Sequence, residues 1–201
     1  MGKRRISGLG TLCGHHRNVV HLQILPTAFD RLVFWLLQLL PVALCIIIQS
    51  WFPEWFLPSR IVLKRQKKGG DDELDNEKAI YQALAPVQGK VVPVCYGEAE
   101  CTETEMTGTR ALVLSDVEGV SLHEDDARGL DVAQLEGMLS EPFRALAELK
   151  VSHDDYKLDN YRLVGDRIMI IDPDFVTFRS VKFVSRLYNN VHRGGAMMSW
   201  L

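Results

Sequence analysis

The amino-acid sequence predicts an α+β fold, and three observations lead to this class. The chain has 201 residues, of which 47% are apolar, so it is long and apolar enough for an ordinary domain with a core. From about Arg60 onward, short runs rich in β-branched residues alternate with segments of helical periodicity. Near the end, a Gly165-Asp166 dipeptide between two apolar runs predicts a tight β-hairpin.

Charge divides the chain into two parts. Residues 1–68 carry ten Lys and Arg against two Asp and Glu, a balance of +8, whereas residues 69–201 carry thirteen against twenty-four, a balance of −11. We therefore predict a basic N-terminal segment, residues 1–57, and a folded domain, residues 58–201. Because the folded part is acidic, nucleic acid is not an expected partner. The four cysteines have no metal-ligand spacing, which favours a reducing, intracellular compartment.

Residues 32–53 contain no charged side chain. As one helix they would span about 33 Å at 1.5 Å per residue, close to the roughly 30 Å of a bilayer core. Flanking tryptophans resemble the aromatic belts of membrane proteins, while Pro41 and Gln38 weaken the pattern. The segment is a transmembrane candidate, with a buried core helix or a segment added by an imperfect gene model as alternatives. The expected location is accordingly cytoplasmic or membrane-associated.

A strand and a helix are predicted next along the chain. The run "RIVLK", residues 60–64, is β-rich and is followed by a charged, glycine-bearing turn. In the following helix, Glu77 shares an apolar face with Ile80, Tyr81 and Leu84 at helical spacing. A carboxylate on such a face is expected to have a cationic partner, although a solvent-facing glutamate at the edge of the face is the commoner case.

Two more strands and a second helix complete the predicted scaffold. The runs "KVVPVCYG" and "TRALVLSDVEG" flank an acidic loop and predict an antiparallel pair. A helical region covers residues 132–150, and Pro142 is expected to start a new segment after Ser140.

The decapeptide "VSHDDYKLDN", residues 151–160, crowds acidic and amide groups into one loop directly before the hairpin. Counting back from the Gly165-Asp166 turn, Asn160 faces Ile171, so Asn160 and Asp172 should emerge side by side at the open end. Together with Asp155 they form an oxygen-rich corner suited to Mg²⁺. The sequence therefore predicts a magnesium site, with its nucleotide, at this corner.

The same loop resembles the H-x-D-x-K-x-x-N catalytic loop of protein kinases and their relatives. Four positions carry the match: His153, Asp155, Lys157 and Asn160. Asp172 stands where kinases place the metal-binding Asp of D-F-G. The residue patterns "HDDYKLDN" and "IIDPD" most resemble those of compact fungal kinase-like proteins and the aminoglycoside-phosphotransferase branch.

Three further matches follow in family order. Lys64 in "IVLK" resembles the strand lysine of V-A-I-K, and Glu77 resembles its helix partner. The run "LVLSDVEGVSL" resembles the hinge between two lobes, with the backbones of Ser115 and Val117 facing adenine. The resemblance implies a two-lobed kinase-like fold over about residues 60–178.

The resemblance also implies a role for each site residue. Asp155 would act as catalytic base toward a hydroxyl acceptor, a protein or a small molecule, and Lys157 would neutralise charge on the phosphoryl group. Asn160 and Asp172 would hold Mg²⁺, and Lys64 would grip the ATP phosphates while Glu77 steadies it. His153 would anchor the loop rather than act as an acid or base.

Several departures from the kinase pattern bear on activity. Asp154 stands where many kinases have an arginine that reads activation-loop phosphorylation, and Pro173 and Asp174 replace the Phe and Gly of D-F-G. No glycine-rich strand pair stands directly before Lys64, and "GLGTLCG", residues 8–14, is expected to be a flexible basic terminus. Only residues 173–201 follow Asp172, so we expect a fragment or a reduced domain with an incomplete N-lobe and a shortened C-lobe.

Three functions remain open from the sequence. The first is an ATP-dependent phosphotransferase, because each polar group that Mg²⁺-ATP chemistry needs has a candidate. The second is a catalytically weak or inactive pseudokinase-like module that binds a nucleotide or a partner. The third is a membrane protein anchored through residues 32–53, whose kinase-like part serves for interaction.

Overall fold

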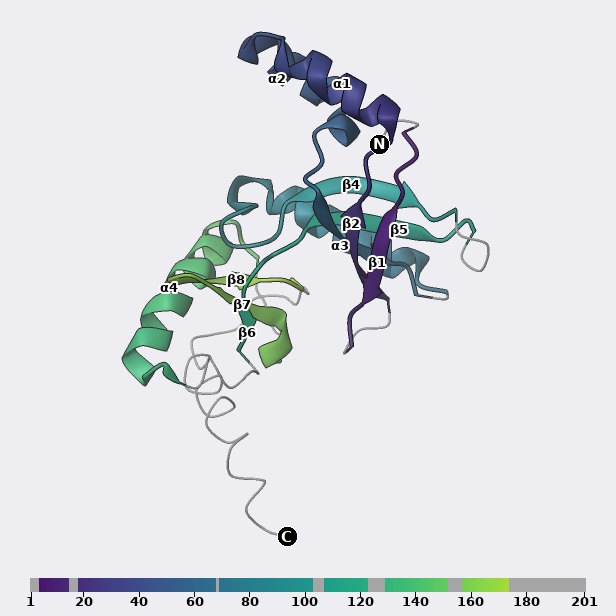
Figure 1. The fold of residues 1–201 in the computed structure, drawn as a ribbon. Helices are drawn as coiled ribbons and strands as arrows, with labels where there is room; N and C mark the ends of the chain where they lie inside the picture. Colours follow the sequence, from purple (N-terminus) through teal and green to yellow (C-terminus); the bar gives the residue numbers. More distant parts are fainter. Residues whose placement is uncertain are drawn as a thin grey trace. The chain divides into compact units, whose positions relative to one another are not determined.

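The computed structural model describes residues 4–14, 18–67, 69–102, 107–122, 129–151 and 157–173. The chain forms two compact units (Figure 1), the first made of residues 1–78 with 94–116 and the second of residues 79–93 with 117–201. Each unit has its own antiparallel sheet, and helices accompany both. The predicted α+β class is therefore confirmed.

The first unit is built on a five-stranded sheet whose strands follow the order β1-β2-β3-β5-β4. Its strands are β1 (Gly8–Leu12), β2 (Val19–Ile24), β3 (Arg60–Arg65), β4 (Cys95–Glu100) and β5 (Arg110–Ser115). The β-rich run at 60–64 and the antiparallel pairing of the next two runs are confirmed, although β4 extends into the acidic segment expected to be a loop. Ile24, Ile61 and Val113 form the buried centre of this unit.

Strands β1 and β2 correct two expectations about the N-terminal part of the chain. Residues 8–14 were expected to be a flexible terminus, but Gly8–Leu12 is a strand that pairs with β2 over its whole length. Strand β2 in turn pairs with β3, from Val19 beside Lys64 to Gln23 beside Arg60. The sheet therefore continues across the predicted boundary between residues 57 and 58. The expectation failed because the helices between β2 and β3 separate these partners in sequence.

Residues 25–59 form a helical insertion between β2 and β3. Helix α1 (Ala28–Gln38) starts with a capping box of Thr27 and Asp30, helix α2 (Val42–Trp51) follows, and a short η1 helix (Pro53–Trp55) leads back toward β3. The uncharged segment is thus two helices rather than the expected single one, because Pro41 sits at the N-cap of α2. Within the described chain, no helix is long and apolar enough to span a bilayer.

Helix α3 (Asp71–Ala83) follows β3, and a short η2 helix (Ala85–Val87) follows α3. The predicted apolar face is confirmed, since Ile80, Tyr81 and Leu84 are all buried. Leu74, three residues before Glu77, is buried as well, so Glu77 lies within an apolar stripe of the helix.

The second unit has a three-stranded sheet in the order β6-β7-β8 and one long helix. Its elements are β6 (Val120–Ser121), α4 (Val132–Glu148), η4 (Leu158–Asn160), β7 (Tyr161–Val164) and β8 (Arg167–Ile170). Helix α4 buries Leu135, Leu139 and Leu146, and the ring of Phe143 lies 6.3 Å from that of Tyr161 on β7.

Helix α4 runs without a break through Pro142, so the expected start of a new segment there is wrong. A proline inside a helix removes one backbone hydrogen bond and usually kinks or ends the helix. Here Pro142 is buried together with the leucines of the same helix. Apolar packing of this helix in the unit therefore prevails over the local cost of the proline.

Candidate functional site

The side chain of Lys64 forms an ion pair with Glu77 in the first unit. Lys64 Nζ donates a hydrogen bond to Glu77 Oε1 at 2.7 Å. The two side chains are only 16% and 13% exposed, so the pair is largely shielded from water. The expected partnership between the strand lysine and the helix glutamate is thus present. It also supplies the cation that a carboxylate on the apolar face of α3 requires.

The sheet fixes the position of Lys64. This residue lies on β3, the middle strand, with Val19 of β2 on one side and Leu112 of β5 on the other. Ladder hydrogen bonds on both sides hold the backbone of β3, which limits the positions that the lysine side chain can reach. The ammonium group is therefore held beside the sheet rather than left to move on a flexible stem.

Charged residues of α3 that flank Glu77 attach the helix to the sheet. Lys78 donates to Glu98 Oε2 at 2.8 Å, and Asp75 accepts from Arg110 Nη2 at 2.5 Å. Arg110 also grips Glu98 with two hydrogen bonds, at 2.5 and 3.1 Å. The bonds from Arg110, and then from Lys78, lower the pKa of Glu98 from 4.5 to about 2. This network orients α3 and hence the carboxylate of Glu77.

A glycine-bearing turn lies next to Lys64, at the same end of the sheet. Strands β1 and β2 are paired up to Leu12 and Val20, and Cys13 N donates to Val19 O at 3.0 Å. The first residue of β2, Val19, is the register partner of Lys64. The connection that contains Gly14 therefore begins one strand away from the lysine, where sequence reasoning expected no glycine loop.

The glycines of β1 have a clear packing reason. A Cβ atom on Gly8 would lie 2.2 Å from the carbonyl oxygen of Gln23, and one on Gly10 would lie 3.1 Å from the side chain of Val20. Gly14 in the turn meets nothing within 4 Å, so space alone would accept a larger residue there. The glycines at 8, 10 and 14 are the sequence signal that could have revealed this hairpin, although a flexible terminus was expected.

The segment predicted as a hinge is where the chain passes from the first unit to the second, between Asp116 and Val117. Ser115 lies at the end of β5, and its N–H already donates to Val94 O at 2.8 Å while its hydroxyl accepts from Val94 N at 2.9 Å. The Ser115 N–H is thus committed to the sheet, whereas Val117 lies beyond it and is half-buried. Contact of either backbone with adenine stays a prediction.

Asp116 forms a pair of contacts that sequence reasoning missed. Its carboxylate contacts His21 Nδ1 on β2 at 3.1 Å and Arg60 Nη2 on β3 at 2.9 Å, and its side chain is only 6% exposed. These bonds tie the start of the hinge segment to two neighbouring strands. No local pattern could have revealed them, because the three residues are far apart in the sequence.

In the second unit, the hairpin has the predicted register. Gly165 adopts a φ of 64° in the turn, and Val164 pairs with Arg167. The pairing continues beyond the strands, because Ile171 N donates to Asn160 O at 2.9 Å. Asp172 follows Ile171 directly and is half-buried. Asn160 and Asp172 therefore leave the open end of the hairpin on adjacent strands.

The donor chemistry of this corner suits a hard divalent cation. An amide oxygen and a carboxylate are ligands that Mg²⁺ accepts, and Asn160 is 98% buried, since its exposed fraction is 2%. Lys157, at the N-cap of η4, is exposed, and its carbonyl accepts from Asn160 N at 3.0 Å. Asp155 and His153 lie outside the described residues. No cluster of three His, Cys, Asp or Glu residues suited to a metal occurs in the part that the structure describes.

No protein-family model matches the sequence, and no curated protein is significantly similar to it. Among solved structures, the chain resembles the PknI kinase domain of Mycobacterium tuberculosis at 18% identity and a TM-score of 0.45, with 60% of this chain and 50% of that chain covered. It also resembles the bifunctional kinase-methyltransferase WbdD at 20% identity and a TM-score of 0.45, with 64% and 32% covered. This chain thus spans half or less of the length of either protein. Likeness at this level assigns no role to any residue.

Proposed function

We propose that this protein is an ATP-dependent phosphotransferase of the protein-kinase-like type, which transfers the γ-phosphate of ATP to a hydroxyl acceptor. The observation that supports the proposal best is the 2.7 Å ion pair of Lys64 and Glu77 beside the glycine-bearing turn of β1 and β2. Protein kinases combine these parts: a strand lysine, its glutamate on a helix, and a glycine-rich loop over the phosphates.

The first unit would hold the phosphates of the nucleotide. Glu77 orients the ammonium of Lys64, which would then attract the α- and β-phosphates. The backbone N–H of Gly14 would approach a phosphate closely, because glycine itself has no side chain. A relationship to fungal kinase-like proteins or aminoglycoside phosphotransferases is part of the same proposal. It rests on the patterns "HDDYKLDN" and "IIDPD" alone.

The second unit would carry the metal and the chemistry. Asn160 and Asp172 would hold Mg²⁺, which when bound neutralises charge on the phosphates. Asp155 would accept the proton of the acceptor hydroxyl, and Lys157, with its exposed ammonium, would neutralise charge on the transferring group. The acceptor is a hydroxyl-bearing protein or small molecule.

A nucleotide-binding module without transfer is the second candidate function. Pro173, which follows Asp172, is buried, and it has a fixed φ and no N–H. Where kinases place a phenylalanine and a glycine after the metal-binding aspartate, this chain therefore has a stiffer segment. Such a segment is compatible with binding but restricts the movements that accompany turnover.

Nucleotide binding is tested by thermal unfolding of the full chain with and without ATP and Mg²⁺. At an ATP concentration 100 times Kd, binding adds about 2.7 kcal/mol to the free energy of unfolding, a rise in Tm of roughly 5–10 °C. Lys64→Met should abolish the rise, whereas Lys67→Met, which removes an exposed lysine paired with Glu73, should leave it intact. No rise at millimolar ATP in the unsubstituted protein would refute nucleotide binding.

Transfer is tested separately, by release of phosphate from ATP and by transfer to a panel of small hydroxyl compounds and proteins. Asp155→Asn should reduce the rate on the order of a hundredfold or more, because the base is lost. The neighbouring Asp154→Asn is the matched control and should change the rate little. A normal ATP-induced rise in Tm with no turnover would leave the binding module as the function.

A further inference from the structure

The helical insertion concentrates the exposed apolar surface of the described chain. Fourteen large apolar side chains are exposed among the described residues, and twelve of them lie between residues 25 and 52, the exceptions being Leu9 and Leu12. Trp51 is 75% exposed, Val42 76% and Ile46 62%. Soluble monomers rarely gather so many exposed large apolar side chains in one segment, and large apolar patches mark interaction sites.

Helix α2 is apolar and exposed around most of its circumference. It has no charged residue and no buried residue, and its exposed large side chains spread widely at 100° per residue: Val42, Leu44, Ile46, Ile47 and Trp51. A groove on a partner protein covers one face of a helix, as in helix-in-groove recognition. A lipid phase can cover all faces, and this favours lipid over a protein groove.

Two polar side chains of α2, those of Cys45 and Ser50, bond to backbone carbonyls of the insertion. The thiol of Cys45 donates to Leu37 O at 3.4 Å and lies 3.9 Å from Leu40 O, and the hydroxyl of Ser50 donates to Ile47 O at 2.7 Å. Hydrocarbon offers no hydrogen bonds, so a segment that enters it must satisfy its polar groups internally. Cys45 and Ser50 meet this requirement.

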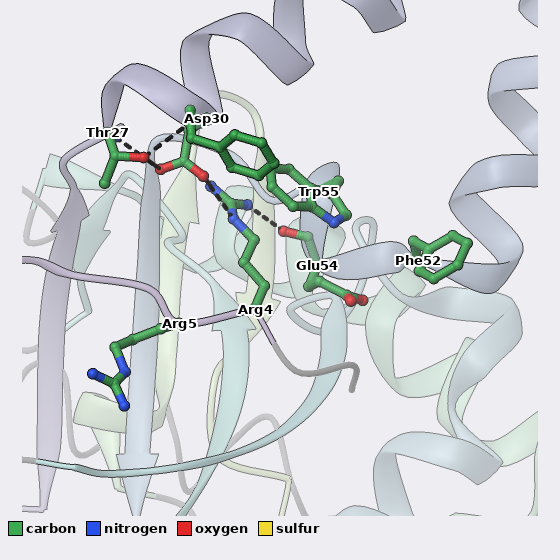
Figure 2. A pocket seen from close by; sticks show the side chains of 8 residues that line it. Arg4, Arg5, Thr27, Asp30, Phe52, Glu54 and Trp55 are labelled. Carbon is green, nitrogen blue, oxygen red and sulfur yellow. Dashed lines mark hydrogen bonds and ion pairs between the residues drawn. The ribbon is translucent and has the colours of Figure 1, made fainter.

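Exposed charge around the insertion is positive. The only two acidic residues of the first 68, Asp30 and Glu54, are both buried, at 7% and 4% exposure. Arg4 contacts both residues in different ways: its guanidinium pairs with the Asp30 carboxylate, 3.0 Å from Oδ1, and it donates to the backbone carbonyl of Glu54 at 2.5 Å (Figure 2). Although burial pushes the pKa of Asp30 upward, bonds from Thr27 and the charge of Arg4 lower it overall.

The same contacts attach the insertion firmly to the rest of the first unit. Arg4 stacks over Trp55 at 4.4 Å and over Phe34 at 5.4 Å, and Trp55 meets the ring of Phe29 edge-on at 5.9 Å. In Figure 2, Arg5 points away from Asp30, so its charge is not consumed by this cluster. Asp30 is thus neutralised within the base of the insertion, and Arg5 and the exposed Arg31 stand outside this cluster.

We propose that the helical pair of α1 and α2 docks this protein on an anionic phospholipid bilayer by inserting into the outer part of the hydrocarbon. At 1.5 Å per residue, α1 and α2 are each roughly 15 Å long, about half of the hydrocarbon thickness. The exposed Trp35 and Trp51 suit the interface between headgroups and acyl chains, and the exposed Arg31 of α1 suits anionic headgroups. This docking is independent of the proposed phosphotransferase function.

Vesicle co-sedimentation of the full chain tests the proposal. We expect binding to phosphatidylcholine vesicles that contain phosphatidylserine, with much weaker binding when that anionic lipid is omitted. Replacing Ile46 and Ile47 together by glutamate should weaken binding on the order of a hundredfold or more. The matched control is Leu9→Glu, an exposed leucine of β1 outside the insertion, which should bind vesicles normally.

Because both isoleucines are exposed, the double substitution should leave the thermal unfolding of the protein unchanged, and this measurement excludes misfolding as the cause of lost binding. A second readout is a blue shift of tryptophan emission on binding that Trp51→Phe diminishes. Absence of vesicle binding would overturn the proposal. So would a stable dimer that the Ile46 and Ile47 substitutions dissociate, because a second copy would then be the occupant.

Discussion

The charge network that attaches α3 to the sheet predicts a specific loss of stability in acid. Glu98 accepts hydrogen bonds from Arg110 and Lys78, and its pKa falls from 4.5 to about 2 in the folded protein. Because the folded-state pKa lies below the unfolded one, the stabilisation is fully present above about pH 4.5. It is lost as the pH falls toward 2. Removing the charge by Glu98→Gln should therefore cost stability at neutral pH and progressively less in acid.

The size of the effect follows from the same two values. A difference between 4.5 and about 2 corresponds to at most roughly 3.4 kcal/mol at neutral pH. The side chain of Glu98 is 23% exposed and that of Arg110 30%, so water screens the network, and we expect about 1–2 kcal/mol. At pH 3 the carboxyl is protonated in the unfolded chain and mostly ionised in the folded one. About two fifths of the stabilisation present at neutral pH should therefore remain.

Urea unfolding at pH 7 and pH 3, followed by tryptophan fluorescence, measures this directly. Three of the four tryptophans lie in the first unit, so the signal reports on the unit that contains Glu98. Glu100→Gln on the same strand is the control, because Glu100 is exposed and should cost little at either pH. An equal cost of Glu98→Gln at both pH values would refute the electrostatic reasoning and point to packing instead.

Three further predictions test the packing of the two units. Gly8→Ala should destabilise the protein by about 1–3 kcal/mol, since its Cβ would meet the Gln23 carbonyl at 2.2 Å. The control Gly14→Ala should be close to neutral, because nothing lies within 4 Å of its Cβ. Equal denaturation midpoints for the two variants would contradict this difference. Leu139→Ala, at a fully buried position of α4, should lower the free energy of unfolding of the second unit by about 2–5 kcal/mol. A decrease under 1 kcal/mol would show that Leu139 is not packed in the core. Gly137→Ala, exposed on the same helix with nothing within 4 Å of its Cβ, should raise stability by about 0.5–1 kcal/mol, and a lower Tm would argue against a helical backbone there.

The elements that the sequence predicted correctly are governed by local rules. The hairpin register follows from one turn, because Gly165 supplies the positive φ and the two-residue period of the strands then aligns Asn160 with Ile171. The apolar face of α3 follows from helical spacing in the same way. The partner of Glu77 was reached by resemblance rather than by local rules, and the ion pair with Lys64 agrees with it.

The features that were predicted wrongly depend on contacts between distant residues. A continuous apolar run cannot show whether Pro41 bends a helix or begins a new one, since this depends on what the helix packs against. Pro142 presents the reverse case, in which burial in α4 overrides the local signal for a break. The triad of His21, Arg60 and Asp116 has no local signature at all.

The position of the Gly14 turn beside Lys64 was also missed, because the helical insertion separates the two residues in the sequence. Fifty residues separate Gly14 from Lys64 in the sequence, yet Ile24 N donates to Ser59 O at 2.8 Å, so the insertion leaves and re-enters the sheet at one point. Pairing of β2 with β3 is thus independent of what lies between residues 25 and 59, and a long insertion costs little extra closure entropy. The turn at Gly14 and the helical insertion therefore lie at opposite ends of β2.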